Sequence, residues 1–252
     1  QWRFSRNFFY RMGISLSDLI DDPNQVNQEV AKRFDQADFS LITYDYEKIA
    51  GILNDIDFEP LQQEDQWHYT YLRGTVAVLG ENNLIDGLYY FNQILTADGI
   101  QKDNIYYILA EAGCGQIYGL QGDLDKAETY YDHVFDVVLH RKIDSDQTAI
   151  KILGMLYAGG VFYAQKQDYD TSNSLLNYAY QICSDTHVVY YLARIVYQLA
   201  LNAKAQHRAV ETITDYLADS LAFARLNGNK HLIEEIARVR HHLIARSSDN
   251  EN

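Results

Sequence analysis

The sequence predicts an all-α protein built from antiparallel helix pairs. Apolar residues recur at spacings of three and four along most of the chain, and no stretch alternates apolar and polar residues between turn signals. The 252 residues include only 2 prolines and 14 glycines, too few for the many turns of a β-sandwich or barrel. Because hydrophobic residues make up 47% of the chain, we expect a large buried core.

Short breakers divide this pattern into helices. Asp21-Asp22-Pro23 forms a cap and turn before the first helix. Pairs such as Gly122-Asp123 and Gly228-Asn229 end one helix and cap the next, since glycine adopts the left-handed conformation and the following side chain accepts from free amides. The predicted helices, in chain order, are 24–39, 43–54, 60–80, 83–96, 102–120, 123–140, 144–165, 169–183, 186–204, 206–227 and 229–246.

The helix at 123–140 shows the periodicity most clearly. Its apolar residues step by three and four and therefore share one face, whereas its charged residues fall largely on the other. The last helix, 229–246, has two apolar rows: Leu232–Ile236–Val239–Leu243 and Ile233–Ala237–Ile244. One row can cover the preceding pair, and the second is either buried in a capping helix or forms a subunit contact.

Three successive helix pairs share one spacing of small, aromatic and apolar residues. The copies are Thr75–Val78–Leu84–Gly87–Phe91–Ile94, Gly115–Tyr118–Gly122–Leu124–Ala127–Tyr131–Val134 and Gly160–Tyr163–Tyr169–Ser172–Leu176–Ala179, spaced by 40 and then 45 residues. A small residue lets the second helix approach closely, and a ring fills the gap beside it. In the third copy Gln167 replaces the loop glycine. One pair cannot bury its face alone, so the pairs are expected to stack.

The clearest copy, GCGQIYGLQGDLDKAETYYDHV at 113–134, resembles a tetratricopeptide repeat with a lengthened first helix, since the usual period is ~34 residues. The segment NFFYRMGISLSDLI at 7–20 resembles the closing helix and tail of a Cro-type helix-turn-helix domain. Together they resemble the Rgg/PlcR-type peptide-sensing transcription regulators of Gram-positive bacteria.

This resemblance implies a right-handed superhelix and a division of the chain into three parts. Residues 1–22 would be the tail of a mostly missing helix-turn-helix domain and its linker, 23–246 the helical-repeat sensor, and 247–252 a frayed tail. It also implies that the concave face binds a short secreted peptide, that the protein is a homodimer, and that DNA is bound only through the absent N-terminal domain. No cofactor is implied.

Charge and cysteine usage agree with this view. The net charge is −14, and because Arg3, Arg6 and Arg11 lie in the first 12 residues, the remaining 18 basic and 35 acidic side chains give −17. Such a chain should repel duplex DNA. Cys114 and Cys183 lie in apolar helical patterns, so we expect reduced, buried thiols and a cytoplasmic location. No apolar run approaches the ~20 residues of a membrane span.

No catalytic or metal-binding motif emerges from the sequence. Gly113-Cys114-Gly115 imitates part of a phosphate loop, but it lies inside a helical pattern and is expected to serve helix packing. The acidic run at 54–59 lacks the central glycine of a calcium loop. His241 and His242 project about 100° apart on a helix, which is poor for shared metal ligation. The sequence therefore predicts no enzyme and no metal.

Several polar and aromatic side chains are candidates for peptide binding. Each alone is an ordinary core or surface residue. All of them, however, are predicted to fall on the first helix of a pair, and these first helices line the inside of the superhelix. The candidates are Tyr69, Arg73, Gln116, Tyr157, Tyr191, Arg194 and Gln198. Tyrosine offers an apolar body with a hydroxyl, and arginine can meet a carboxylate through two parallel hydrogen bonds. We expect Arg194→Ala to weaken peptide binding at least tenfold and to leave the melting temperature nearly unchanged.

Two other functions remain open at this stage. A constitutive protein-interaction scaffold would have the same fold without a DNA role, and a helical enzyme would need a polar cluster. The codons upstream of Gln1 would separate the first of these from a regulator, because only a regulator requires a helix-turn-helix domain there.

Overall fold

The computed structural model describes residues 23–249, and every regular element in this range is a helix. The predictions for residues 1–22, including the helix-turn-helix resemblance, and for residues 250–252 lie outside the described residues. The elements are α2 (Pro23–Ile42), α3 (Tyr46–Asn54), α4 (Gln63–Thr75), a π-helical turn η2 (Val76–Gly80), α5 (Leu84–Leu95), α6 (Ile105–Gln121), α7 (Leu124–Val138), α8 (Asp146–Gln165), α9 (Tyr169–Thr186), α10 (Leu192–Ala205), α11 (Val210–Leu226) and α12 (Lys230–Asp249).

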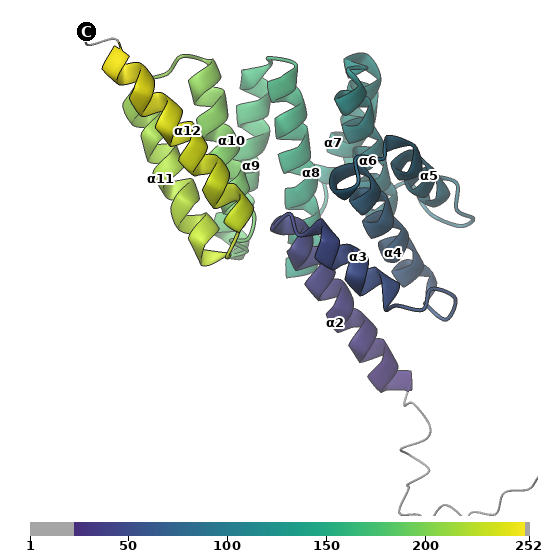
Figure 1. Ribbon diagram of the computed structural model, residues 1–252. Coiled ribbons are helices and arrows are strands. Elements are labelled where there is room, and N and C mark those ends of the chain that lie inside the picture. The colour runs from purple at the N-terminus through teal and green to yellow at the C-terminus, as the bar shows by residue number, and fades with distance from the viewer. Residues whose placement is uncertain (1–22, 250–252) are drawn as a thin grey trace, which may run out of the picture.

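Successive helices pack as pairs, and the pairs stack in chain order. The pairs are α2/α3, α4/α5, α6/α7, α8/α9 and α10/α11, with α12 against the last of them (Figure 1). The first helices α4, α6, α8 and α10 also contact one another in series, which forms the inner layer of the stack. The predicted fold class, a superhelix of antiparallel helix pairs, is confirmed. None of the described helices is long and apolar enough to cross a membrane.

A common turn joins the two helices of most pairs. One residue adopts the left-handed conformation, as Gly122 does with φ 81°, and the next residue caps the following helix. Gln167 takes the same conformation with φ 64°, which confirms that it replaces the loop glycine. In both turns the amide that follows, of Asp123 or Asp168, donates to a carbonyl five residues earlier at 2.9 Å.

Non-glycine residues with a positive φ explain two errors in the predicted boundaries. The helix predicted at 206–227 begins at Val210, because His207 adopts φ 55° and the chain turns there. The helix predicted at 186–204 begins at Leu192, because α9 continues to Thr186 and His187 ends it with φ 60°. At the other end of the chain, α12 continues to Asp249, beyond its predicted end at 246.

Glycines set the close spacing between helices. A Cβ at Gly115 would lie 3.1 Å from the Tyr131 ring, and one at Gly160 would lie 2.8 Å from Leu176, as the repeat pattern predicts. Phe91 of α5 is packed against Gly74 of α4, where a Cβ would lie 2.6 Å from its ring, and against Gly113 of α6. The expected packing role of the Gly113-Cys114-Gly115 run is therefore confirmed.

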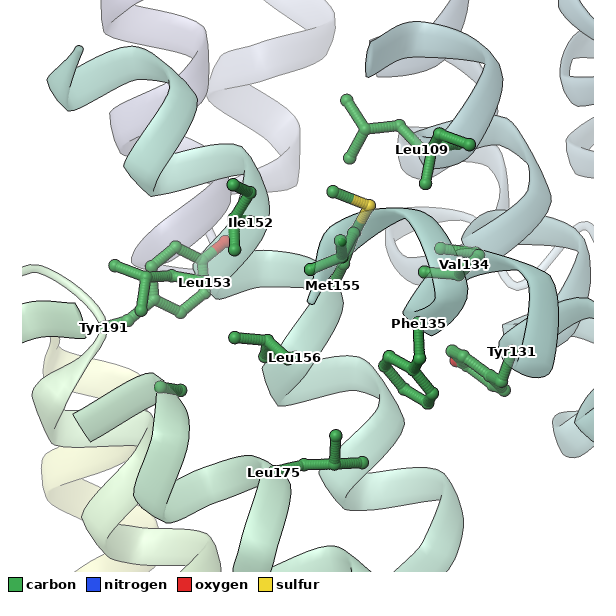
Figure 2. Close-up of a cluster of buried hydrophobic side chains, with 14 of the residues drawn as sticks. Leu109, Tyr131, Val134, Phe135, Ile152, Leu153, Met155, Leu156, Leu175 and Tyr191 are labelled. Carbon is green, nitrogen blue, oxygen red and sulfur yellow. The ribbon is translucent and has the colours of Figure 1, made fainter. Parts of the chain in front are cut away.

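One large core runs through the stack from α4 to α10, and Figure 2 shows its centre at α7 and α8. Tyr131 stacks on Phe135 at 5.7 Å and on Phe162 at 4.8 Å between ring centroids. Both cysteines are unpaired and 1% exposed, and burial raises the pKa of each thiol to about 12. The expectation of reduced, buried thiols is confirmed.

Helix α12 closes the stack with its first apolar row. Leu232 and Ile236 are fully buried, and Val239 packs half-buried in the same cluster with α10 and α11. In the second row Ile233 is half-buried and Ala237 is exposed. The capping role is thus confirmed for the first row, and a subunit contact by the second stays a prediction.

The glycine contacts give a testable difference between two alanine substitutions. Gly159 of α8 is buried against the ring of Phe135, and a Cβ there would overlap the ring, whereas Gly51 of α3 is exposed with nothing within 4 Å of its Cβ position. We expect Gly159→Ala to lower the free energy of unfolding by about 1–3 kcal/mol through overpacking. Gly51→Ala should raise it by up to ~1 kcal/mol, because alanine favours the helix. Urea denaturation of both variants measures the difference, and equal effects would contradict it.

Candidate functional site

A pocket of about 250 Å³ opens on the inner layer of the superhelix. It is lined by the first helices α4, α6, α8 and α10, by Phe91 of α5, and by the turn between α2 and α3. These elements come from five successive helix pairs, so the site exists only because the pairs stack. Among the described residues that line it, Arg194 is the only charged side chain, and most of the aromatic side chains are tyrosines.

Small residues create the space in this pocket. Ala112 and Gly113 of α6, with Gly154 and Ala158 of α8, line it without side chains that could fill it. Larger apolar residues such as Met155 supply the rest of an apolar floor. A floor of this kind accepts an apolar side chain of a ligand, because burial there removes apolar surface from water.

Arg194 of α10 supplies a positive charge in the lining of the pocket. Its side chain is buried, with 7% of the residue exposed, and its Nε donates a hydrogen bond of 2.7 Å to the hydroxyl of Tyr44. The guanidinium lies 3.8 Å from the ring centroid of Tyr44, 4.5 Å from that of Tyr157 and 5.8 Å from that of Tyr191. These cation–π contacts partly replace the lost hydration of the cation.

The charge of Arg194 has no acidic partner among the described residues. None of the ion pairs between described side chains includes it. The tyrosines do not supply the missing charge either, since burial raises the pKa of Tyr191 to about 12, although Arg194 lowers it, and likewise raises the pKa of Tyr44 and Tyr46. A buried cation without a counter-charge is costly, and an anionic ligand group would relieve that cost.

Other polar side chains also line the pocket. Gln116 of α6 is half-buried in the lining, and its amide makes no hydrogen bond to any described residue. The hydroxyl of Tyr157 is 3.3 Å from that of Tyr44. Tyr191 points toward α8 beside Leu153, as Figure 2 shows. An amide and hydroxyls at these positions can bind the backbone of an extended peptide.

The structure brings four of the predicted site residues together: Gln116, Tyr157, Tyr191 and Arg194 all line the pocket. Tyr69 and Arg73 meet each other, with Arg73 Nε donating to the Tyr69 hydroxyl at 3.0 Å, but they lie outside it. Arg73 also donates to Asn54 Oδ1 of α3 at 2.7 Å. The expectation that Tyr69 and Arg73 line the same site as the other candidates is therefore not met.

Helix register explains where α4 departs from the prediction. The residues of α4 that line the pocket are Tyr71 and Thr75. Tyr69 lies two positions before Tyr71, and Arg73 lies two positions before Thr75. Two residues correspond to roughly 200° around a helix, so the predicted pair faces away from the pocket and toward α3.

Gln198 of α10, one turn after Arg194, is also outside the pocket lining. Its amide donates to Asn202 Oδ1 at 2.9 Å.

The α2–α3 turn contributes residues that the sequence analysis missed. Tyr44 and Tyr46 line the pocket, although they are about 150 residues from Arg194 in the chain. Tyr44 has φ 64°, in a turn without glycine, and no local pattern marks it as a pocket residue. The repeat alignment does not identify Tyr71 or Thr75 either, because at its offset of 40 residues the pocket residue Gln116 corresponds to Val76.

The described chain is a superhelix of helix pairs with a largely apolar, tyrosine-rich pocket on its inner layer, and two solved structures share the fold. PlcR of Bacillus thuringiensis, solved in complex with the peptide PapR7 and DNA, matches with a TM-score of 0.67 at 15% identity, over 95% of this chain and 82% of PlcR. ComR of Streptococcus suis matches with a TM-score of 0.53 at 15% identity, over 93% of this chain and 78% of ComR.

Both comparisons show a similar fold at low sequence identity. No protein-family model matches the sequence, and no curated protein matches it either. The resemblance to Rgg/PlcR-type regulators is confirmed at the level of the fold. In the described part of the chain, no group of three or more His, Cys, Asp or Glu side chains could hold a metal ion.

Proposed function

We propose that the chain is the peptide-sensing region of a transcription regulator and that a short linear peptide binds in the pocket on its inner layer. One observation carries this proposal: Arg194 is a buried cation in the lining of a largely apolar pocket, without an acidic partner among the described residues. The fold of PlcR, which was solved with a peptide and DNA, supports the same function.

The pocket suits the end of a peptide better than a whole one. Its volume of about 250 Å³ is slightly below the ~300–1,000 Å³ of typical small-molecule sites. Arg194 would hold a carboxylate, because its guanidinium has five N–H donors and Tyr44 accepts from only one of them. Gln116 would bind the peptide backbone, and the small-residue floor would take an apolar side chain. The rest of the peptide would follow the inner layer.

The remaining parts of the proposal concern the whole regulator. DNA would be bound by a helix-turn-helix domain that precedes this chain, because a net charge of −14 disfavours contact with phosphates. The protein would act as a cytoplasmic homodimer and use a secreted peptide for quorum sensing, without a cofactor. The peptide would bind one arrangement of the superhelix better than another and thereby shift the population. Catalysis has no part in this mechanism.

Calorimetry with synthetic peptides tests the proposal. Short apolar peptides encoded near the gene are titrated into the chain, each with a free C-terminal carboxylate and as the C-terminal amide. We expect at least one peptide to bind, and an amide of that peptide to bind at least tenfold more weakly, about 1.4 kcal/mol, if its C-terminus meets Arg194. A chain that binds none of them, with no helix-turn-helix encoded upstream, would favour the constitutive scaffold.

A further inference from the structure

Tyr44 joins the first helix pair to the last third of the chain. Its hydroxyl accepts from Arg194 of α10, it lies 3.3 Å from the Tyr157 hydroxyl of α8, and its ring lies 5.3 Å from that of His231 of α12. Tyr44 also has φ 64°, a conformation that residues with a Cβ adopt rarely. The residue in the left-handed position of this turn thus also has long-range side-chain contacts to α8, α10 and α12.

The second half of α2 is held against the same elements. Asp38 bonds to His68 of α4 at 2.8 Å and lies 4.0 Å from Lys151 of α8. Asp35 accepts from Gln147 of α8 at 2.9 Å, and Phe39 meets the ring of Tyr190, which precedes α10. In Figure 1, α2 crosses in front of α8 and its other end continues toward the N-terminal residues. A displacement of the α2–α3 turn would thus move the helix that leads to residue 22.

The position of Tyr44 on Arg194 coincides with the place where a ligand carboxylate is needed. We propose that Tyr44 is an internal ligand of Arg194, and that a carboxylate ligand displaces it and thereby releases the α2–α3 turn from α8 and α10. This inference rests on the proposed function of the pocket. A carboxylate forms charge-assisted hydrogen bonds with a guanidinium, which are stronger than those of a neutral phenol, so it can replace the hydroxyl at Nε.

Burial of Tyr44 keeps its phenol neutral, since its pKa lies well above the ordinary value despite the opposing effect of Arg194. The covering turn therefore satisfies one donor of Arg194 without neutralising its charge. The site stays receptive to an anion although Arg194 is buried. Binding at Arg194 is thereby coupled to movement of α2. The pocket is in this way coupled to the part of the chain that precedes α2.

Hydrogen exchange and a set of simple probes test this coupling on the 252-residue chain. The probes are N-acetyl-phenylalanine, its C-terminal amide, and the α-amide of N-acetyl-aspartate, which separate a C-terminal carboxylate from a side-chain carboxylate. We expect a carboxylate probe, and not the uncharged amide, to accelerate exchange at residues 41–47, where the Asp45 amide donates to Ser40 at 2.9 Å. Exchange in α7 serves as the internal reference.

Tyr44→Phe keeps the ring and removes the hydroxyl. This variant should bind the carboxylate probe at least about fivefold more tightly, because no hydroxyl competes for Nε of Arg194. Tyr44→Ala should show fast exchange at 41–47 without any probe. The matched control is Tyr89→Ala, an exposed tyrosine of α5 outside the pocket, which should change neither quantity. Circular dichroism confirms that each variant is folded.

The outcomes separate this inference from the proposed function. If a peptide or probe binds through Arg194 and exchange at 41–47 stays unchanged, the displacement of Tyr44 is overturned while peptide binding stands. If neither the unmodified chain nor any variant, Tyr44→Ala included, binds the carboxylate probe more tightly than the amide probe, Arg194 is not a carboxylate subsite. The inference then fails. Faster exchange with the aspartate probe alone would support displacement and assign the carboxylate to an acidic side chain.

Discussion

Replacing Phe91 by alanine is expected to lower the free energy of unfolding by about 3–5 kcal/mol, the usual cost of removing a buried phenylalanine ring. The ring is 2% exposed and fits between Gly74 of α4 and Gly113 of α6, while Tyr71 lies 6.2 Å away between centroids. Its loss would leave a cavity between three helices that are held close by glycine. Because Phe91 also lines the pocket, the cavity would open into the proposed binding site.

Urea denaturation measures the cost, and Tyr89→Ala on the same helix is the control. Tyr89 is 59% exposed, and a surface substitution of this kind usually changes stability by less than ~0.5 kcal/mol. A loss below ~1 kcal/mol for Phe91→Ala would show that the neighbouring helices collapse into the space, and that the glycine contacts do not fix their separation.

Replacing Arg194 by methionine is expected to weaken peptide binding at least tenfold, about 1.4 kcal/mol, with a much smaller effect on stability. Methionine has a similar length and no charge, and replacing a buried ion by an apolar residue of similar volume is often neutral or stabilising. The Tyr44 hydroxyl would keep the Tyr157 hydroxyl as a neighbour at 3.3 Å. The burial of Arg194 also corrects the expectation for Arg194→Ala, since truncation would leave a cavity and lower the melting temperature.

Arg73→Met is the matched control for this experiment. Arg73 lies on α4 and bonds to Tyr69 and Asn54 outside the pocket, so its replacement should leave peptide affinity unchanged. Calorimetry with one bound peptide compares the two variants directly. Equal losses at Arg73 and Arg194 would contradict the placement of the site, and unchanged affinity in Arg194→Met would remove Arg194 from it.

Periodicity was enough to predict the helices, their pairing and the side of most first helices that faces inward. It placed Gln116, Tyr157 and Arg194 correctly, because each follows from the register of a regular helix. It failed for Tyr69 and Arg73 on α4 and for Gln198 on α10. It also failed for Tyr44, whose contact with Arg194 joins residues 150 positions apart and depends on how five pairs curve in space. Local spacing carries no information about that curvature.

The link from α2 to α8, α10 and α12 has a consequence for folding cooperativity. In a linear repeat array each unit touches only its neighbours, so the ends can unfold separately from the middle. Here the N-terminal pair also contacts helices near the C-terminus, through Asp38, Phe39 and Tyr44. Those contacts close a long loop of the chain. The conformational entropy of that loop must be lost before the contacts can form. The first pair should therefore fold late, as the element that binds the completed stack.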